Sequence, residues 1–329
     1  MHHRSTFFEW LFVKSRLLWL PLAAALVFAL IPLIGAALAE NPAHLIQSER
    51  WRGLLVAPAM IVYVIGVAPF VERGWTRVYT SLRPVLPLDD GGYARLLSAV
   101  TTPHPRRELL ALAVGALLGL LRVSYTVEGA PTWLDAYLLL STALLFGLLA
   151  WVIYLTVGHT QATAAILRQP LCIDPTEISS FMPIGEQGLI LALVFVGGTV
   201  LSLLFSALEP SVFSQIDFWL IYVPIALVPV AVFFLAMRPT HRVLADAKNR
   251  ELKVVRQELR RAGGRLLDQR AQSEDPAPIS QQVLALAALE SRLQAARTWP
   301  YNTPMLRTLF VSVLAPGALL LARWLLGIR

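Results

Sequence analysis

Cysteine and lysine are both scarce in this chain of 329 residues. The single cysteine, Cys172, cannot form a disulfide within the chain, and a metal site would need histidine and carboxylate ligands instead. The three lysines, Lys14, Lys248 and Lys253, do not follow a glycine, which excludes a Walker A phosphate loop. The last hydrophobic run, 308–328, holds no lysine for a Schiff base, so a retinal protein is excluded as well.

Charged residues are also few. They make up 15% of the chain, against about 25% in an ordinary soluble domain, while 56% of the residues are hydrophobic. Long uncharged runs of this kind are what the ~30 Å hydrocarbon layer of a bilayer requires. The composition therefore predicts an integral membrane protein and excludes disordered, collagen-like and disulfide-scaffold proteins.

Seven hydrophobic runs are long enough to cross a bilayer as helices at about 1.5 Å per residue. They are 17–39, 53–71, 109–127, 133–157, 189–208, 216–237 and 308–328. The sequence thus predicts an all-α membrane protein with a six-helix region over 1–237, a polar segment over 238–307 and a seventh helix within 308–329. The first run resembles a secretory signal, but its apolar stretch is longer than a signal core, so we expect a helix there.

The basic residues are distributed unevenly between the connections. Of the 28 lysines and arginines, 23 lie in the N-terminal tail and in alternate connections on the same predicted side. The positive-inside rule then places the N-terminus in the cytoplasm and the C-terminus outside the cell (inner) membrane. The basic side should meet the anionic headgroups of the inner leaflet. There, residues 88–97 read as a short amphipathic helix whose first turn is stabilised by Asp89 and Asp90.

The segment 238–307 carries 13 basic and 7 acidic residues. Its apolar residues recur at alternating spacings of three and four, which predicts a coiled-coil seam in a cytoplasmic helical hairpin; the main seam residues are Leu252, Val255, Leu259 and Leu266. We expect this seam to serve both packing within the hairpin and assembly with other copies, giving a homo-oligomer. A nucleic-acid partner is not expected, because the segment lacks base-stacking aromatic residues and any known nucleic-acid module.

Small residues line one face of two hydrophobic runs. In 109–127 the face consists of Ala111, Gly115, Gly119 and Arg122. In 189–208 and just beyond it consists of Gly198, Ser202, Ser206 and Glu209, with Thr199 beside it. Such faces suit close helix packing or the polar lining of a pore. For the face in 109–127, helix packing is favoured over a pore lining. For the face in 189–208, the hydroxyl groups leave both interpretations open.

Arg122 is the clearest charge within a hydrophobic run. Because both small-residue faces are predicted to run outward, Arg122 and Glu209 should lie at similar depth and form an intramembrane ion pair. Glu128, Asp135 and Asp217 are alternative partners for the arginine.

The histidines give no sign of catalysis. They form no HExxH motif, and the chain has no Gly-x-Ser-x-Gly elbow, so neither an enzyme nor a cofactor is expected. His159, at the inner end of the fourth run, is the only candidate for chemistry, and we expect it to face the headgroups.

Three function classes fit these features. An ion channel is favoured, because several subunits can share a lining of hydroxyl groups and backbone without a charged midplane. The alternative is an assembly or signalling scaffold, in which the membrane helices anchor a hairpin that recruits a partner. A small-molecule transporter is third, because the chain has no midplane acid and no clear repeated halves.

Overall fold

The computed structural model describes residues 23, 25–28, 30–31, 34–35, 50–101, 104–124, 133–171, 178–206, 216–271 and 277–325. The structure is 92% helical, and these described residues include no strand. The helices are α4 (Arg50–Leu82), α5 (Asp90–Thr101), α6 (Pro105–Ser124), α7 (Trp133–Ile166), α8 (Met182–Ser206), α9 (Ile216–Ala271), α10 (Ala277–Ala295) and α11 (Thr303–Leu325). The prediction of an all-helical chain is confirmed.

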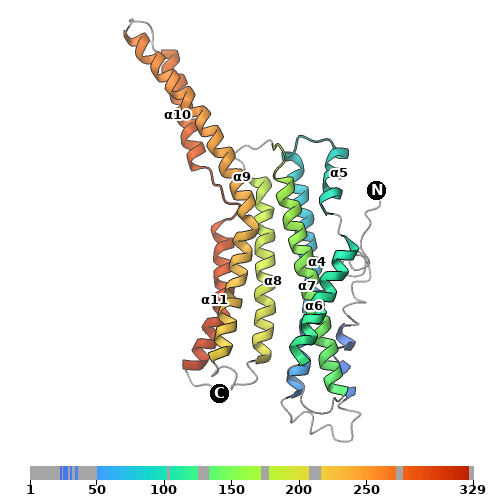
Figure 1. Ribbon diagram of the computed structural model, residues 1–329. Helices are drawn as coiled ribbons and strands as arrows, with labels where there is room; N and C mark the ends of the chain where they lie inside the picture. The colour runs from blue at the N-terminus through green and yellow to red at the C-terminus, as the bar shows by residue number, and fades with distance from the viewer. Residues whose placement is uncertain are drawn as a thin grey trace.

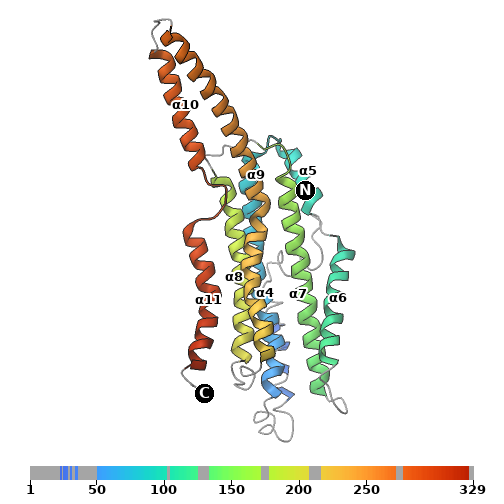
Figure 2. The same ribbon diagram turned by 60° about the vertical axis from the view of Figure 1, so that its left-hand side comes forward.

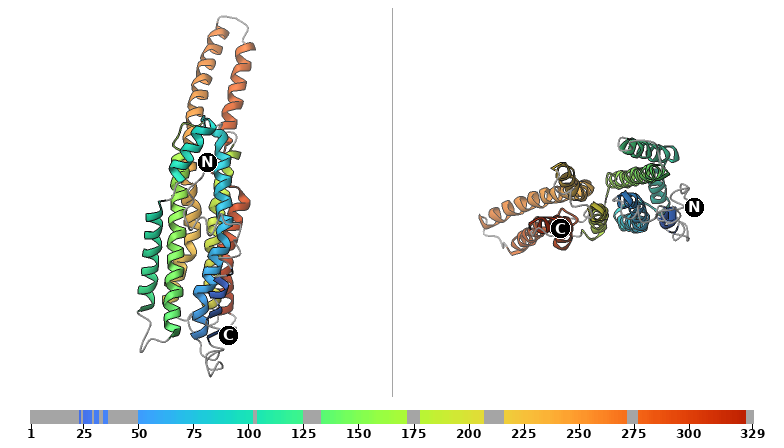
Figure 3. Two further views of the ribbon diagram at one scale, coloured as in Figure 1. Left: turned by 90° about the vertical axis from the view of Figure 1, so that its right-hand side faces the viewer. Right: turned by 90° about the horizontal axis from the view of Figure 1, so that it is seen from below.

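The long helices stand side by side in a row (Figure 1). Helix α6 packs on α7, α7 on α4, α4 on α8, and α8 on both α9 and α11. Seen from below, this order gives an elongated cross-section (Figure 3). Beyond the bundle, the end of α9 and all of α10 project together as an arm (Figure 2). We define the arm as Ala247–Ala271 of α9 with α10.

Four segments of the described chain are long and apolar enough to cross a membrane. They are Leu54–Val85, Trp133–Ile166, Ser179–Leu204 and Leu227–Asp268. These lengths and compositions are compatible with a membrane protein. The predicted runs 109–127 and 308–328 correspond to α6 and α11, which are not among the four, and most of 17–39 lies outside the described residues.

Several helices are longer than the hydrophobic runs that predicted them. Helix α4 continues past residue 71 to Leu82, because Trp75, Val78 and Leu82 still bury an apolar face after the sequence has become polar on the other. Helix α9 is a single helix of 56 residues that joins the run 216–237 to the first helix of the segment 238–307.

A compact apolar core lies at the end of the bundle from which the arm projects. Trp75, Val78 and Leu82 of α4 meet Ile166 of α7 and Leu244 of α9 there. Helix α5 covers this core with its apolar face, and its start is capped by Asp89, whose Oδ1 accepts the Gly92 amide at 3.0 Å. The predicted short helix with an aspartate at its start is confirmed.

The α6–α7 pair is held by close approach of two backbones. A Cβ added at Gly115 would collide with the carbonyl oxygen of Phe146, and one at Gly119 would lie 2.8 Å from that of Thr142. From the other side, a Cβ at Gly147 would lie 3.2 Å from the carbonyl oxygen of Leu112. The small-residue face of α6 is therefore used for packing.

The two helices of the arm pack through side chains. Leu252 and Val255 of α9 are buried with Leu293 of α10. On the flank of this contact, Arg256 Nε donates to Glu290 Oε1 at 2.7 Å. The seam is therefore apolar at its centre and ionic at its edge.

The connection from α10 to α11 is fixed to α9 and α8. Lys248 Nζ donates to the carbonyl oxygens of Gln294 and Ala296 at 2.6 and 2.8 Å, which satisfies the carbonyl end of α10. The ring of Trp299 stacks on His241 with centroids 3.9 Å apart. The backbone at Pro300 then passes so close to Gly185 that no larger residue fits there.

Candidate functional site between helices α4, α7 and α8

Polar side chains gather where α4 faces α7 near the arm end of the bundle. Glu72, Trp75 and Tyr79 lie at spacings of three and four on α4, which places them on one face of that helix. His159 projects toward this face from α7. The continuation of α4 past residue 71 is what brings the three α4 residues to His159.

His159 contacts three side chains of α4. The hydroxyl of Tyr79 is 2.8 Å from its Nδ1, and a carboxylate oxygen of Glu72 is 4.0 Å from its Nε2. The indole of Trp75 stacks on the imidazole with centroids 5.0 Å apart and planes 14° apart. The His159 side chain is 19% exposed and that of Glu72 34% exposed. His159 therefore faces α4. The sequence had led us to expect that it faces the headgroups, and the structure does not bear this out.

Gln187 of α8 reaches the same part of α4 from the other side. It is 1% exposed, and its Nε2 donates to the carbonyl oxygen of Val71 at 3.1 Å. Its amide oxygen lies over Gly74, where the missing side chain leaves room for it. Within the described part of the chain, neither Gln187 Oε1 nor Trp75 Nε1 has a hydrogen-bond partner. Buried polar atoms of this kind are normally satisfied by protein or by ordered water.

Helix α5 is tied to this site through Tyr93. Its hydroxyl donates to the carbonyl oxygen of Tyr79 at 2.6 Å, and the guanidinium of Arg83 lies 5.4 Å from its ring centroid. Arg83 also forms an ion pair with Asp90 at 2.6 Å. Burial raises the pKa of Tyr93, so its hydroxyl remains a proton donor over the physiological range.

This arrangement places an acid, an imidazole and two buried polar atoms with spare hydrogen-bonding capacity among apolar helices. The Tyr79 hydroxyl and the His159 imidazole share a hydrogen bond, and Gln187 Oε1 and Trp75 Nε1 can each take a further partner. No group of three or more histidine, cysteine, aspartate or glutamate residues suited to a metal ion occurs among the residues described.

The small-residue face of α8 lies against α4. A Cβ added at Gly198 would be in ordinary contact with Met60 and Tyr63, at 3.5 and 3.6 Å. The Thr199 hydroxyl donates to the carbonyl oxygen of Phe195 at 3.0 Å, within its own helix. Ser202 is half-buried.

The structure does not describe the side chains of three residues that the sequence singled out. Ser206 and Arg122 belong to α8 and α6, but their side chains lie outside the described residues, as does Glu209 entirely. The proposed pair between Arg122 and Glu209 therefore stays a prediction.

The predicted assembly seam lies between the two helices of the arm. Leu252 and Val255 are buried against α10, and Leu259 and Leu266 are half-buried on the same side of α9. One chain therefore already covers most of this seam.

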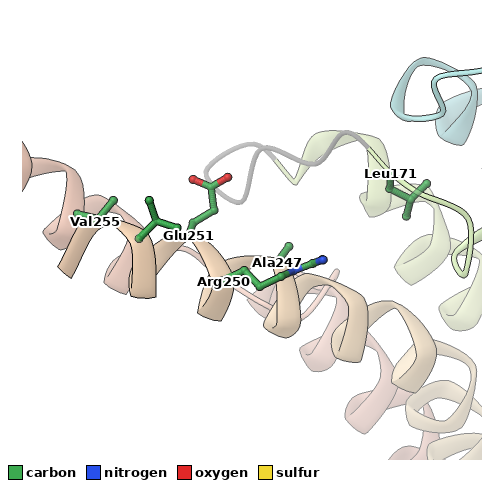
Figure 4. A pocket seen from close by; sticks show the side chains of 6 residues that line it. Leu171, Ala247, Arg250, Glu251 and Val255 are labelled. Carbon is green, nitrogen blue, oxygen red and sulfur yellow. The ribbon is translucent and has the colours of Figure 1, made fainter. Parts of the chain in front are cut away.

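A separate groove of about 380 Å³ opens at the base of the arm. In Figure 4, Leu171 lies across it from α9, the Glu251 carboxylate points away from α9, and the Arg250 side chain lies along that helix. Its apolar wall includes Ala247 and Val255.

The hydrophobic run 53–71 ends before Glu72, so the sequence did not predict the Glu72–His159–Tyr79 cluster. The signal was available: Glu72, Trp75 and Tyr79 continue the helical spacing of the preceding run.

The fold defines an all-helical chain with helices apolar enough to cross a membrane. Comparison with family models, with curated proteins and with solved structures found no match to this chain.

Proposed function

We propose that the chain crosses the cell membrane seven times, with its N-terminus and the arm in the cytoplasm and its C-terminus outside. The distribution of basic residues supports this orientation. The outer faces of α6 and α11 support two further spans, because Leu110, Leu117 and Leu314 are highly exposed there and would otherwise meet water. Exposed Arg73 and Arg77 on α4 then lie at the level of anionic inner-leaflet headgroups.

We further propose that the protein is a homo-oligomeric channel that passes small ions. The observation that carries this proposal is the polar site around His159 and Gln187, where buried polar atoms of α4 and α8 lie beside the apolar core of the bundle. Ionisable and unsatisfied polar groups are expensive in such surroundings and usually face water or a partner. We place the cytoplasmic mouth of the ion path at this site.

The row of helices supports an oligomer. The described helices form an elongated layer, in which α7 packs on α4, α4 on α8, and α8 on α9 and α11, with a smaller contact between α7 and α9; the ion path of the proposed channel lies between copies of this layer. Several copies side by side can enclose one.

The test is electrical recording from the purified protein in planar bilayers, with a variant that removes the amide but keeps the volume. Gln187→Met should lower the unitary current several-fold, because an apolar side chain replaces a group that holds water at the mouth. The matched control is Gln161→Met on the exposed side of α7, which should conduct as the unchanged protein does. Silent bilayers with the unchanged protein, or equal currents in both variants, would contradict the proposal.

The scaffold is the second candidate, and the continuity of α9 favours it. One helix runs from the bundle into the arm, and Lys248 and Trp299 fix the returning chain to it. An arm held this rigidly suits the presentation of a binding surface. Deleting Lys248–Arg297 should then abolish partner binding while leaving the membrane helices folded, whereas a channel assembled without the arm should keep its current.

A further inference from the structure

One face of α10 is turned away from α9 and carries no charge. It consists of Gln281, Leu284, Ala288, Ser291 and Ala295, at spacings of three and four, and all five residues are exposed. Leu284 is 70% exposed. Residues 277–289 include no charged side chain at all. We call these five residues the outer face of α10.

The opposite side of the arm is strongly basic. Arg250, Lys253 and Arg260 are exposed on α9, away from α10, and Arg261 beside them forms an ion pair with Glu258 at 2.7 Å. Two arms that met through α9 would bring these cations together, and like charges in contact are unfavourable. Two arms that met through α10 would avoid this repulsion and leave both basic sides outermost.

The inner face of α10 is already occupied within the chain. Leu286 and Leu293 pack against α9, and Glu290 is paired with Arg256. What remains is a helix face of about four turns whose five residues are uncharged, with the exposed Arg292 at its edge; its apolar residues contribute favourable free energy if they are removed from water. Its three-four spacing is that of a helix-to-helix seam.

We propose that the outer face of α10 binds the same face of a second copy of this chain. This inference rests on the oligomer and the cytoplasmic arm proposed above, and it names the surface through which the arms associate. Two copies inserted the same way round are related by a two-fold axis along the membrane normal, so their α10 helices run parallel and in register. Each residue of the outer face then meets its own counterpart, and the small side chains of Ala288 and Ala295 allow close approach.

The test is disulfide cross-linking in native membranes. The chain has one natural cysteine, so Cys172→Ala gives a background without thiols. In that background, Ala288→Cys should form a covalent dimer on mild oxidation, because the two counterparts face each other across the axis. Gln257→Cys is the matched control, because Gln257 is exposed on α9, away from α10, and should remain monomeric.

A second variant asks whether the apolar contact holds the arms together. Adding Leu284→Arg to Ala288→Cys should abolish most of the cross-linked dimer, because it places two cations face to face. Leu284 is exposed in the single chain, so the fold should be retained, which thermal unfolding would check. The inference is overturned if position 288 remains monomeric, if position 257 cross-links equally well, or if the product has the mass of a different partner.

Cross-linking and bilayer recording can fail separately. A covalent dimer with silent bilayers would remove the channel and keep the arm contact. Ionic currents without a dimer would remove the arm contact and keep the channel.

Discussion

The α6–α7 pair and the α9–α10 pair are both antiparallel helix pairs, yet they are held together differently. In the first, Gly115 and Gly119 bring α6 against the backbone of α7. In the second, Leu252, Val255 and Leu293 form an apolar centre, and ion pairing flanks it. Lipid gives little hydrophobic drive between helices, so close van der Waals contact must serve, whereas in water the burial of leucine supplies the drive. The two kinds of contact are those that the proposed topology requires, with the α6–α7 pair in lipid and the α9–α10 pair in water.

The largest effect should come from breaking the arm. Leu293→Ala removes the most buried side chain of the seam and should destabilise the α9–α10 pair by about 2–4 kcal/mol, a typical loss for a core leucine. The loss of stability would be measured by urea unfolding, with hydrogen exchange of the α10 amides as the readout. The control is Leu267→Ala, whose side chain is 68% exposed and whose loss should be small. Equal losses from the two variants would mean that the seam does not hold the arm.

Breaking the glycine contact between α6 and α7 should have a smaller effect than breaking the arm. Gly115→Ala adds a single Cβ that meets the Phe146 carbonyl oxygen, so α6 must move away, at a cost of about 1–3 kcal/mol. Thermal unfolding in detergent would measure it. Gly66→Ala is the matched control within α4: apart from the neighbouring backbone of its own helix, nothing lies within 4 Å of the added Cβ, and the change should be neutral or slightly stabilising. A neutral Gly115→Ala would remove backbone approach as the basis of the α6–α7 pair.

The smallest effect is the pH dependence of the arm. The hydrogen bond from Arg256 lowers the pKa of Glu290 below its usual value. A carboxyl group whose pKa is lower in the folded state contributes stability above its unfolded pKa, and this contribution is lost as the pH falls through the folded pKa. The arm should therefore become less resistant to urea as the pH falls below about 4.5. Arg256→Gln should flatten this dependence, and an unchanged profile in that variant would contradict the assignment.

The sequence predicted the positions of the helices better than their ends. Hydrophobic runs locate most helices, and Asp89 marks the start of α5. The ends of α4 and α9 could not be read from hydropathy, because they are fixed by packing between distant segments: Leu82 and Leu244 are buried in one core that includes residues of α7 and α8. Gly263 and Gly264, which would weaken an isolated helix, lie within α9, where α10 packs alongside.

The site was predictable only in fragments. His159 stands out in the sequence, but its partners are Glu72 and Tyr79, about eighty residues away in the chain. Nothing in the local sequence distinguishes Gln187. Its position is defined only in the fold, where Gly74 of another helix leaves room for its amide oxygen. Long-range juxtapositions of this kind carry no local pattern, so a sequence-based search finds the single residue and misses the group.

The unbroken length of α9 gives the molecule a mechanical property. The part of α9 within the arm, Ala247–Ala271, is a rod about 37 Å long at 1.5 Å per residue. A tilt of about 10° where it leaves the bundle would sweep the tip through roughly 6 Å, more than one helical turn. Lys248 and Trp299 hold the segment between α10 and α11 against α9. The arm would therefore tilt as one body about its base, which lies beside the core around Leu244. A small change in the tilt of α9 at the edge of the bundle would therefore displace the far end of the arm by a much larger distance.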